Sequence, residues 1–139
     1  MQTKIPLPTN IEKQEDLDHS LVIKRTDGII EVRCGDLAIY SSEKVAENHA
    51  CIKKFAEGKK ALVLTIAGIY THVMPEARAY TSKGPHKDFI AAEAFLVTSF
   101  AQWVLAGFFI KINRPIVPAN FFRMKDKEKA EAWLLSFKK

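Results

Sequence analysis

The sequence is short of the residues and runs that mark several classes of protein. It holds only two cysteines, Cys34 and Cys51, without the spacing of a metal site or a redox pair. It has six glycines and six prolines among its 139 residues, and no repeat or low-complexity segment. The first residues, Met1 to Pro6, contain no apolar stretch like that of a secretory signal. We therefore expect a protein without a metal or other cofactor, kept in the reducing cytoplasm.

Signals for a membrane span or a nucleic-acid surface are also weak. The run 94–110 carries no charge but is near the lower length limit for a spanning helix, and it includes Thr98, Ser99 and Gln102. We divide it into the end of a buried strand and the start of a helix. The net charge of +5 is spread along the chain, not gathered into one basic stripe with exposed aromatics. These features argue against a transmembrane segment and against nucleic-acid binding.

The apolar residues that are present indicate a single α/β domain. The composition, 47% hydrophobic and 27% charged, is that of a soluble globular protein. Short apolar runs at 61–67, 89–97 and 119–124 are separated by segments long enough for helices. This alternation is typical of a parallel sheet with crossover helices.

The N-terminal part predicts antiparallel strands in front of that sheet. Residues 1–19 are polar and read either as a loosely ordered leader or as a short edge element, so we place the domain at 20–139. Strands are expected over 21–25 and 29–34, joined by a turn at Asp27-Gly28, which is a strong hairpin signal. Alternation in the second strand predicts one buried face and one that is at least partly wet.

Local signals at helix ends predict about four helices. The first runs from Ser41 to Glu57, with Ser41-Ser42-Glu43 at its start and Gly58 as the stop. The others are expected over 75–82, 100–112 and 126–137. The whole order is β-β-α-β-α-β-α-β-α, a mixed and mostly parallel sheet with an N-terminal hairpin.

The helix expected over 100–112 is apolar around most of its circumference. A helix of this kind must be covered on more than one side. It either packs between the sheet and another helix or forms part of an oligomer contact. A homodimer and a well-covered monomer therefore fit the sequence equally well.

The loop from Gly68 to Met74 is the strongest candidate for a binding site. It follows the predicted strand 61–67 and leads into the helix that begins at Pro75. Folds of this class place ligands at the carboxyl ends of their parallel strands. The candidate binding residues are Tyr70, Thr71, His72 and Glu76.

No pattern in the sequence indicates an enzyme. Pairs such as His72 with Glu76, or His86 with Asp88, are too generic to identify an acid–base site. His49 falls on the apolar stripe of the first helix, where a histidine is usually a core or boundary residue. We therefore expect no catalytic residue and no metal ligand.

Two passages together resemble a known group of proteins. They are Gly-Phe-Phe-Ile-Lys-Ile-Asn-Arg-Pro-Ile-Val-Pro at 107–118 and Lys-Glu-Lys-Ala-Glu-Ala-Trp-Leu at 127–134. This combination is similar to that of small bacterial proteins described as STAS-like, or STAS/SEC14-like, and the resemblance extends over roughly residues 20–137. It implies a mixed sheet with helices packed on it, as in the antagonists of anti-sigma factors.

In those antagonists a regulated serine lies in an Asp-Ser-Ser-Gly sequence where a loop enters a helix. The aligned positions here are Val73-Met74-Pro75-Glu76, which contain no serine. The resemblance thus implies a non-enzymatic regulatory module that lacks the phosphorylatable motif and binds a protein partner, such as a sensor or kinase-like regulator. The SEC14 part of the resemblance, with the aromatic residues of 100–112, suggests an alternative, a small carrier of a lipid or other apolar ligand.

Overall fold

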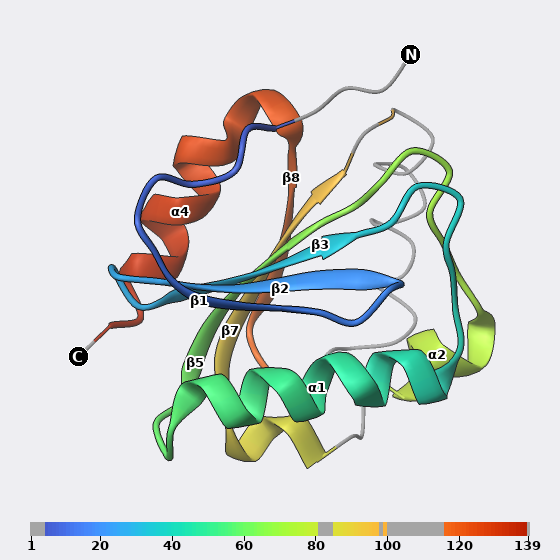
Figure 1. The fold of residues 1–139 in the computed structure, drawn as a ribbon, viewed down its shortest axis with the longest axis horizontal. Coiled ribbons are helices and arrows are strands. Elements are labelled where there is room, and N and C mark those ends of the chain that lie inside the picture. The colour runs from blue at the N-terminus through green and yellow to red at the C-terminus, as the bar shows by residue number, and fades with distance from the viewer. Residues whose placement is uncertain (1–4, 81–84, 98, 100–115, 139) are drawn as a thin grey trace.

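The fold is built on one six-stranded sheet (Figure 1). The computed structural model describes residues 5–80, 85–97, 99 and 116–138. The strands lie side by side in the order β1-β2-β3-β5-β7-β8. Their bounds are β1 Ile11–Asp16, β2 Ser20–Arg25, β3 Ile29–Cys34, β5 Ala61–Ile66, β7 Ile90–Val97 and β8 Ala119–Arg123.

The sheet is antiparallel on one side and parallel on the other. β1, β2 and β3 pair antiparallel, whereas β3, β5, β7 and β8 pair parallel. The predicted hairpin is confirmed: Asp27 Oδ1 accepts a hydrogen bond from the Ile29 amide, and Gly28 adopts a φ of 96°. Glycine suits that conformation because it has no Cβ to clash. The α/β class and the mixed, mostly parallel sheet are confirmed.

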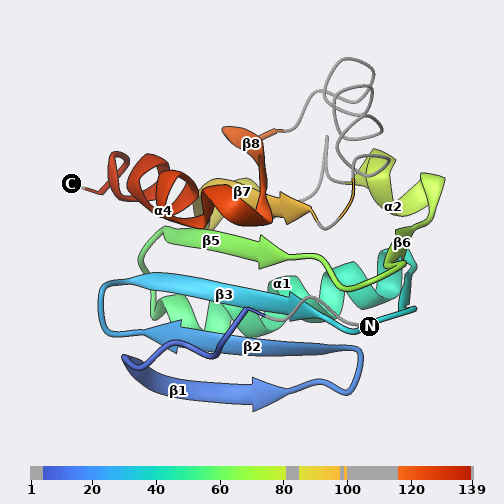
Figure 2. The same ribbon diagram turned by 90° about the horizontal axis from the view of Figure 1, so that it is seen from above.

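Helices cover both faces of the sheet (Figure 2). α1, Ser42–Ala56, packs on one face, and α4, Lys127–Leu135, packs on the other. Ser41 caps α1 by accepting a hydrogen bond from the Lys44 amide. The helix ends at Glu57, which takes a left-handed φ of 52°. Both ends agree with the sequence prediction. Shorter elements are α2 Pro75–Tyr80, η1 Pro85–Asp88 and η2 Met124–Asp126.

The apolar side chains form one cluster on each face. Ile52 and Phe55 of α1 pack with Val22, Val32 and Val63 of the sheet. Ala130 and Leu134 of α4 pack against Ile29, Leu64 and Leu96 on the opposite face. Trp133 and Phe137 are partly buried beside this second cluster, as the helical spacing of these residues predicts.

Some elements differ from the sequence prediction. β1 is an edge strand inside the polar segment 1–19, so the sheet begins before residue 20 and the edge-element alternative applies there. A two-stranded parallel ladder, β4 Ile39–Tyr40 with β6 His72–Val73, was not expected. The apolar helix predicted over 100–112 lies outside the described residues, and so do residues 81–82 of the helix predicted over 75–82.

The expectation that one face of β3 would be partly wet is wrong for its central residue. Glu31 on that face is fully buried. It accepts hydrogen bonds from Arg25 and Arg33, and Arg25 also contacts Glu131 of α4. Charged residues are buried only when they are paired in this way. Water is excluded from this face because α4 covers it. α4 also supplies the Glu131 carboxylate that accepts a hydrogen bond from Arg25.

Candidate functional site

Two loops meet at the carboxyl ends of β3 and β5. One leads from β3 into β4, and the other leads from β5 into β6. The β4/β6 ladder joins them, with Ile39 opposite His72 and Tyr40 opposite Val73. A further backbone hydrogen bond of 2.8 Å runs from the Leu37 amide to the Ile69 carbonyl. We call residues 35–40 and 68–73 the corner.

Side chains also tie the two loops of the corner together. The Thr71 hydroxyl accepts a hydrogen bond from the Gly68 amide at 2.8 Å and donates one to the Gly35 carbonyl at 3.0 Å. Asp36 Oδ1 accepts a hydrogen bond from the Ile69 amide at 2.7 Å. The bonds from Thr71 to Gly35 and from Ile69 to Asp36 join residues 36 and 33 apart in sequence. The corner is therefore a fixed structure and not a pair of independent loops.

The close approach of the two loops requires glycine at position 68. A Cβ added to Gly68 would lie 2.8 Å from the carbonyl carbon and oxygen of Gly35. We expect Gly68→Ala to lower the free energy of unfolding by about 1–3 kcal/mol, because the backbone must shift to relieve the clash. Chemical denaturation measures this loss. Gly35→Ala is the control: its nearest contact is 3.3 Å, so it should cost less. An equal or larger loss for Gly35→Ala would contradict the argument.

The corner displays large apolar side chains to solvent. Leu37, Ile39 and Tyr70 are exposed by 70%, 55% and 78%. Among the described residues, the other exposed large hydrophobic side chains are Leu7 and Leu135, at 53% and 37%. An apolar surface concentrated in one place is a common mark of an interaction site.

Two of these side chains stand on left-handed backbone. Leu37 has a φ of 62° and Tyr70 a φ of 57°. This conformation is unfavourable for a residue with a Cβ and costs about 1–2 kcal/mol. Asparagine or glycine would relieve the strain at both positions. Backbone strain of this kind tends to occur at functional sites, where the surrounding structure holds it in place.

The four residues selected from the sequence fall in or beside the corner. Tyr70 is exposed at its tip, and His72 is exposed on β6. Thr71 uses its hydroxyl inside the corner, as described above. Glu76 is exposed in the first turn of α2. Within the described part of the chain, no hydrogen bond or ion pair joins His72 to Glu76. Leu37 and Ile39 were missed, because nothing in the sequence around them indicates a site.

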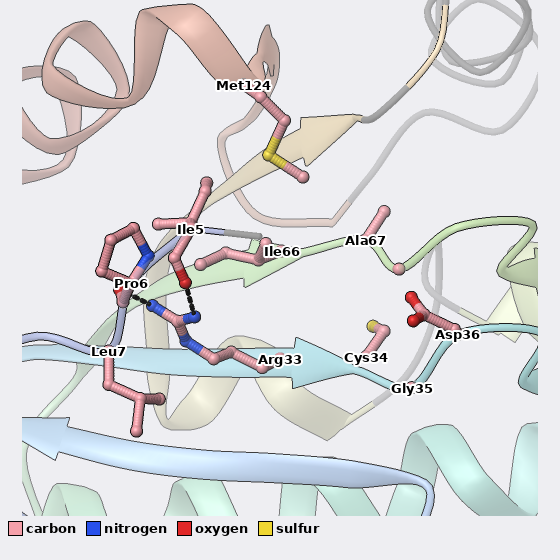
Figure 3. Close-up of a pocket in the computed structure, with 11 residues that line it drawn as sticks. Ile5, Pro6, Leu7, Arg33, Cys34, Gly35, Asp36, Ile66, Ala67 and Met124 are labelled. Carbon is pink, nitrogen blue, oxygen red and sulfur yellow. Dashed lines mark hydrogen bonds between the residues drawn. The ribbon is translucent and has the colours of Figure 1, made fainter. Parts of the chain in front are cut away.

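A depression of about 430 Å³ adjoins the corner (Figure 3). Arg33, Cys34 and Ile66 line it at the strand ends, and Ile5 and Met124 close it from other parts of the chain. Burial raises the pKa of the Cys34 thiol to about 11, although a hydrogen bond with Tyr40 acts in the opposite direction. A protonated thiol is a poor nucleophile. The depression therefore offers space and hydrogen bonds but no activated cysteine.

The structure also brings together two histidines that sequence reasoning treated separately. The rings of His49 on α1 and His86 on η1 stack with centroids 4.6 Å apart, and His86 Nε2 lies 3.9 Å from Glu93 Oε1. Burial lowers the pKa of His49 to about 4, and the charge of His86 acts in the same direction. Burial raises the pKa of Glu93 to about 7. These three residues are all more than nine-tenths buried.

The described residues contain no group of three or more histidine, cysteine or acidic side chains that could hold a metal ion. No helix in the described part of the chain is long and apolar enough to cross a membrane.

Comparison with known proteins matches the chain to a family. A family model described as "Domain of unknown function (DUF7793)" matches residues 22–138, which is most of the chain. The match begins within β2 and ends after α4, so it includes both loops of the corner. No curated protein and no solved structure matches the chain.

Proposed function

Since the chain belongs to the family described as a domain of unknown function (DUF7793), whose description gives no activity, we propose a function from the corner: a non-enzymatic regulatory module that binds a protein partner there. The observation that carries the proposal is the exposure of Leu37, Ile39 and Tyr70 on a surface held rigid by cross-loop hydrogen bonds. Because the backbone that carries these side chains is already held in place, its ordering costs little on binding.

The charges of the domain support a protein partner over a nucleic acid. Many of the basic side chains already have acidic neighbours: Lys13 and Lys24 pair with Glu57, and Lys54 pairs with Glu15. Neutralised lysines release few counterions from a phosphate backbone. At the corner itself the exposed surface is mainly apolar, which suits a protein contact.

The resemblance of residues 107–134 to STAS-like proteins supports the regulatory part of the proposal. Such a module would act in the cytoplasm, and a sensor or kinase-like protein is the kind of partner expected. Both cysteines are free thiols, which suits a reducing compartment. A homodimer, which the apolar helix predicted over 100–112 suggests, is a separate alternative to a complex with another protein. Analytical ultracentrifugation of the purified protein distinguishes a homodimer from a complex with another protein.

The corner can be tested without damaging the fold. We expect the double variant Leu37→Asn/Tyr70→Asn to lose partner binding by at least about tenfold in Kd, since burying each large apolar side chain contributes roughly 1.5–3 kcal/mol. Asparagine accepts left-handed backbone better than leucine or tyrosine, so the thermal midpoint should stay the same or rise. Thr71 is unsuitable for this test because its hydroxyl holds the corner together.

The experiment uses an affinity-tagged chain in its native host, with gentle crosslinking and mass spectrometry that also reads phosphorylation sites. The control is Leu135→Gln, which removes an exposed apolar side chain at the end of α4, away from the corner. A partner lost with the double variant and kept with the control supports the proposal. Equal recovery with both variants, or no protein partner at all, would overturn it.

The alternative function, a small carrier of a lipid or other apolar ligand, rests on the aromatic residues of 100–112. These lie outside the described residues, and no contact of the described part of the chain favours a carrier. Its test is extraction of the purified protein with organic solvent. A stoichiometric lipid in the extract would move the proposal from a partner-binding module to a carrier.

A further inference from the structure

The N-terminal segment Ile5–Leu7, which we call the strap, lies along the depression beside the corner (Figure 3). Its main chain faces Arg33 of β3. Arg33 Nη1 donates a hydrogen bond of 2.6 Å to the Ile5 carbonyl, and Nη2 donates one of 2.8 Å to the Pro6 carbonyl. One guanidinium therefore binds the strap through hydrogen bonds to two successive main-chain carbonyls.

A hydrogen bond to Glu31 holds the Arg33 guanidinium in place independently of the strap. Its Nε donates a hydrogen bond of 2.9 Å to Glu31 Oε1, and Glu31 is fully buried. The two Nη groups then point outward in the planar fork of an arginine side chain. Such a fork can accept any extended chain whose carbonyls have the same spacing, because its hydrogen bonds to the strap are to main-chain carbonyls.

The sequence keeps the strap extended. Ile5 and Leu7 each precede a proline, Pro6 and Pro8. A residue before proline is restricted to extended conformations, and proline cannot donate a main-chain hydrogen bond. Extended proline-containing segments lose little conformational entropy when they bind, and several recognition domains bind them for this reason.

Few other contacts hold the strap in place. The Ile5 side chain packs against the apolar cluster on the α4 face. Leu7 is exposed by 53%, and within the described residues its amide makes no hydrogen bond. The next backbone anchor is the bond from the Thr26 amide to the Asn10 carbonyl. One apolar side chain and two carbonyls thus account for most of the attachment.

We propose that the strap occupies a peptide site, and that the site also binds an extended apolar–proline–apolar segment of a partner, held by Arg33 through its main chain. The inference rests on the proposed function, because the inference specifies the chemistry of the proposed protein partner at the surface next to the corner. The strap then acts as an internal competitor. A partner segment gains access when the strap leaves, and its apolar residue takes the position of Ile5.

A labelled peptide tests the site without knowledge of the physiological partner. The probe is the chain's own segment Thr3–Asn10, acetylated, amidated and carrying fluorescein, and its binding to the full-length protein is followed by fluorescence anisotropy. A tethered competitor has a high effective concentration, on the order of millimolar. We therefore expect weak binding to the native protein and at least tenfold tighter binding to an Ile5→Asp variant, in which the strap loses its apolar anchor.

Leu7→Asp is the matched control, since it adds the same charge to an exposed strap residue and leaves Ile5 in place. It should bind the peptide as weakly as the native protein.

Arg33→Lys in the Ile5→Asp background should lose the gained affinity, because lysine keeps the positive charge near Glu31 but lacks the two-pronged donor. If Ile5→Asp folds poorly, Pro6→Gly, which loosens the strap without adding charge, takes its place.

Equal affinity for the native, Ile5→Asp and Leu7→Asp proteins would overturn the peptide site. So would tight binding that survives Arg33→Lys, or dimerisation of the Ile5→Asp variant by strap exchange without peptide binding. None of these outcomes bears on the pull-down with Leu37→Asn/Tyr70→Asn. The two proposals can therefore fail separately.

Discussion

Replacing Glu31 with alanine is expected to lower the free energy of unfolding by about 3–5 kcal/mol, the usual cost of removing one partner from a buried charge network. Glu31 is fully buried and accepts hydrogen bonds from Arg25 and Arg33. Without it, two guanidinium groups at 9% and 15% side-chain exposure lose their shared counter-charge. The thermal midpoint should fall by about 10–20 °C.

Two further variants separate charge from volume in this experiment. Glu31→Gln has nearly the same size, so most of the loss should persist if the charge is responsible. Glu12→Ala removes an acidic residue of β1 whose contact with Lys24 is solvent-exposed, and it should change stability by less than about 0.5 kcal/mol. A Glu31→Gln protein as stable as the native one, measured by urea denaturation, would show that the buried charge is not the cause.

The second large effect is a pair of opposite pH dependences at His49 and Glu93. His49 stays neutral in the folded protein down to its pKa of about 4, whereas in the unfolded chain it takes up a proton below about 6.5. Its contribution to stability is complete above pH 6.5 and is lost as the pH falls from about 6.5 to about 4. The shift corresponds to about 3 kcal/mol.

Glu93 acts in the other direction. The folded protein keeps its carboxyl protonated up to a pKa of about 7, whereas the unfolded chain releases that proton above about 4.5. Its contribution is present below pH 4.5 and is lost as the pH rises to about 7, again by about 3 kcal/mol. Between pH 4.5 and 6.5 the two groups oppose each other, so their effects largely cancel in the native protein.

Single variants remove the cancellation. Relative to the native protein, His49→Phe should lose stability as the pH rises from 4.5 to 6.5, because the variant lacks the contribution that His49 gains over that range. Glu93→Gln should show the reverse slope. Phenylalanine keeps a ring against His86 and Tyr80, which limits the packing change. Denaturant unfolding at several pH values measures both curves, and taking each difference from the native protein cancels the titrations common to all three. Parallel curves would contradict the assignment.

Local sequence signals determined most of the elements of the fold. The apolar runs at 61–67, 89–97 and 119–124 correspond to β5, β7 and β8, and the Asp27-Gly28 turn to the β2–β3 hairpin. Helix caps were also readable, because Ser41 and Gly58 act on backbone within a few residues of themselves. Such signals concern hydrogen bonds and side-chain periodicity that a short stretch of chain settles on its own.

The candidate site could be predicted only in part. The position of Tyr70 after a parallel strand was readable, since ligands commonly bind where such strands end. The role of Leu37 and Ile39 was not, because their exposure depends on a ladder between β4 and β6 that joins residues 33 apart. The strap was hidden for the same reason: Arg33 is 28 residues from the carbonyl it binds at Ile5.

Buried polar groups mark the boundary between what the sequence determined and what tertiary structure decided. Periodicity assigned Glu31 to a partly wet face, yet α4 covers that face and brings Glu131 to Arg25 across 106 residues. His49 was recognised as a residue of the apolar stripe, but its stacking with His86 arises only when η1 folds against α1. The chain itself fixes where strands and helices form, because those interactions are local. Which charges pair, which histidines stack and which apolar side chains stay in solvent depend on burial, which exists only after distant elements have packed.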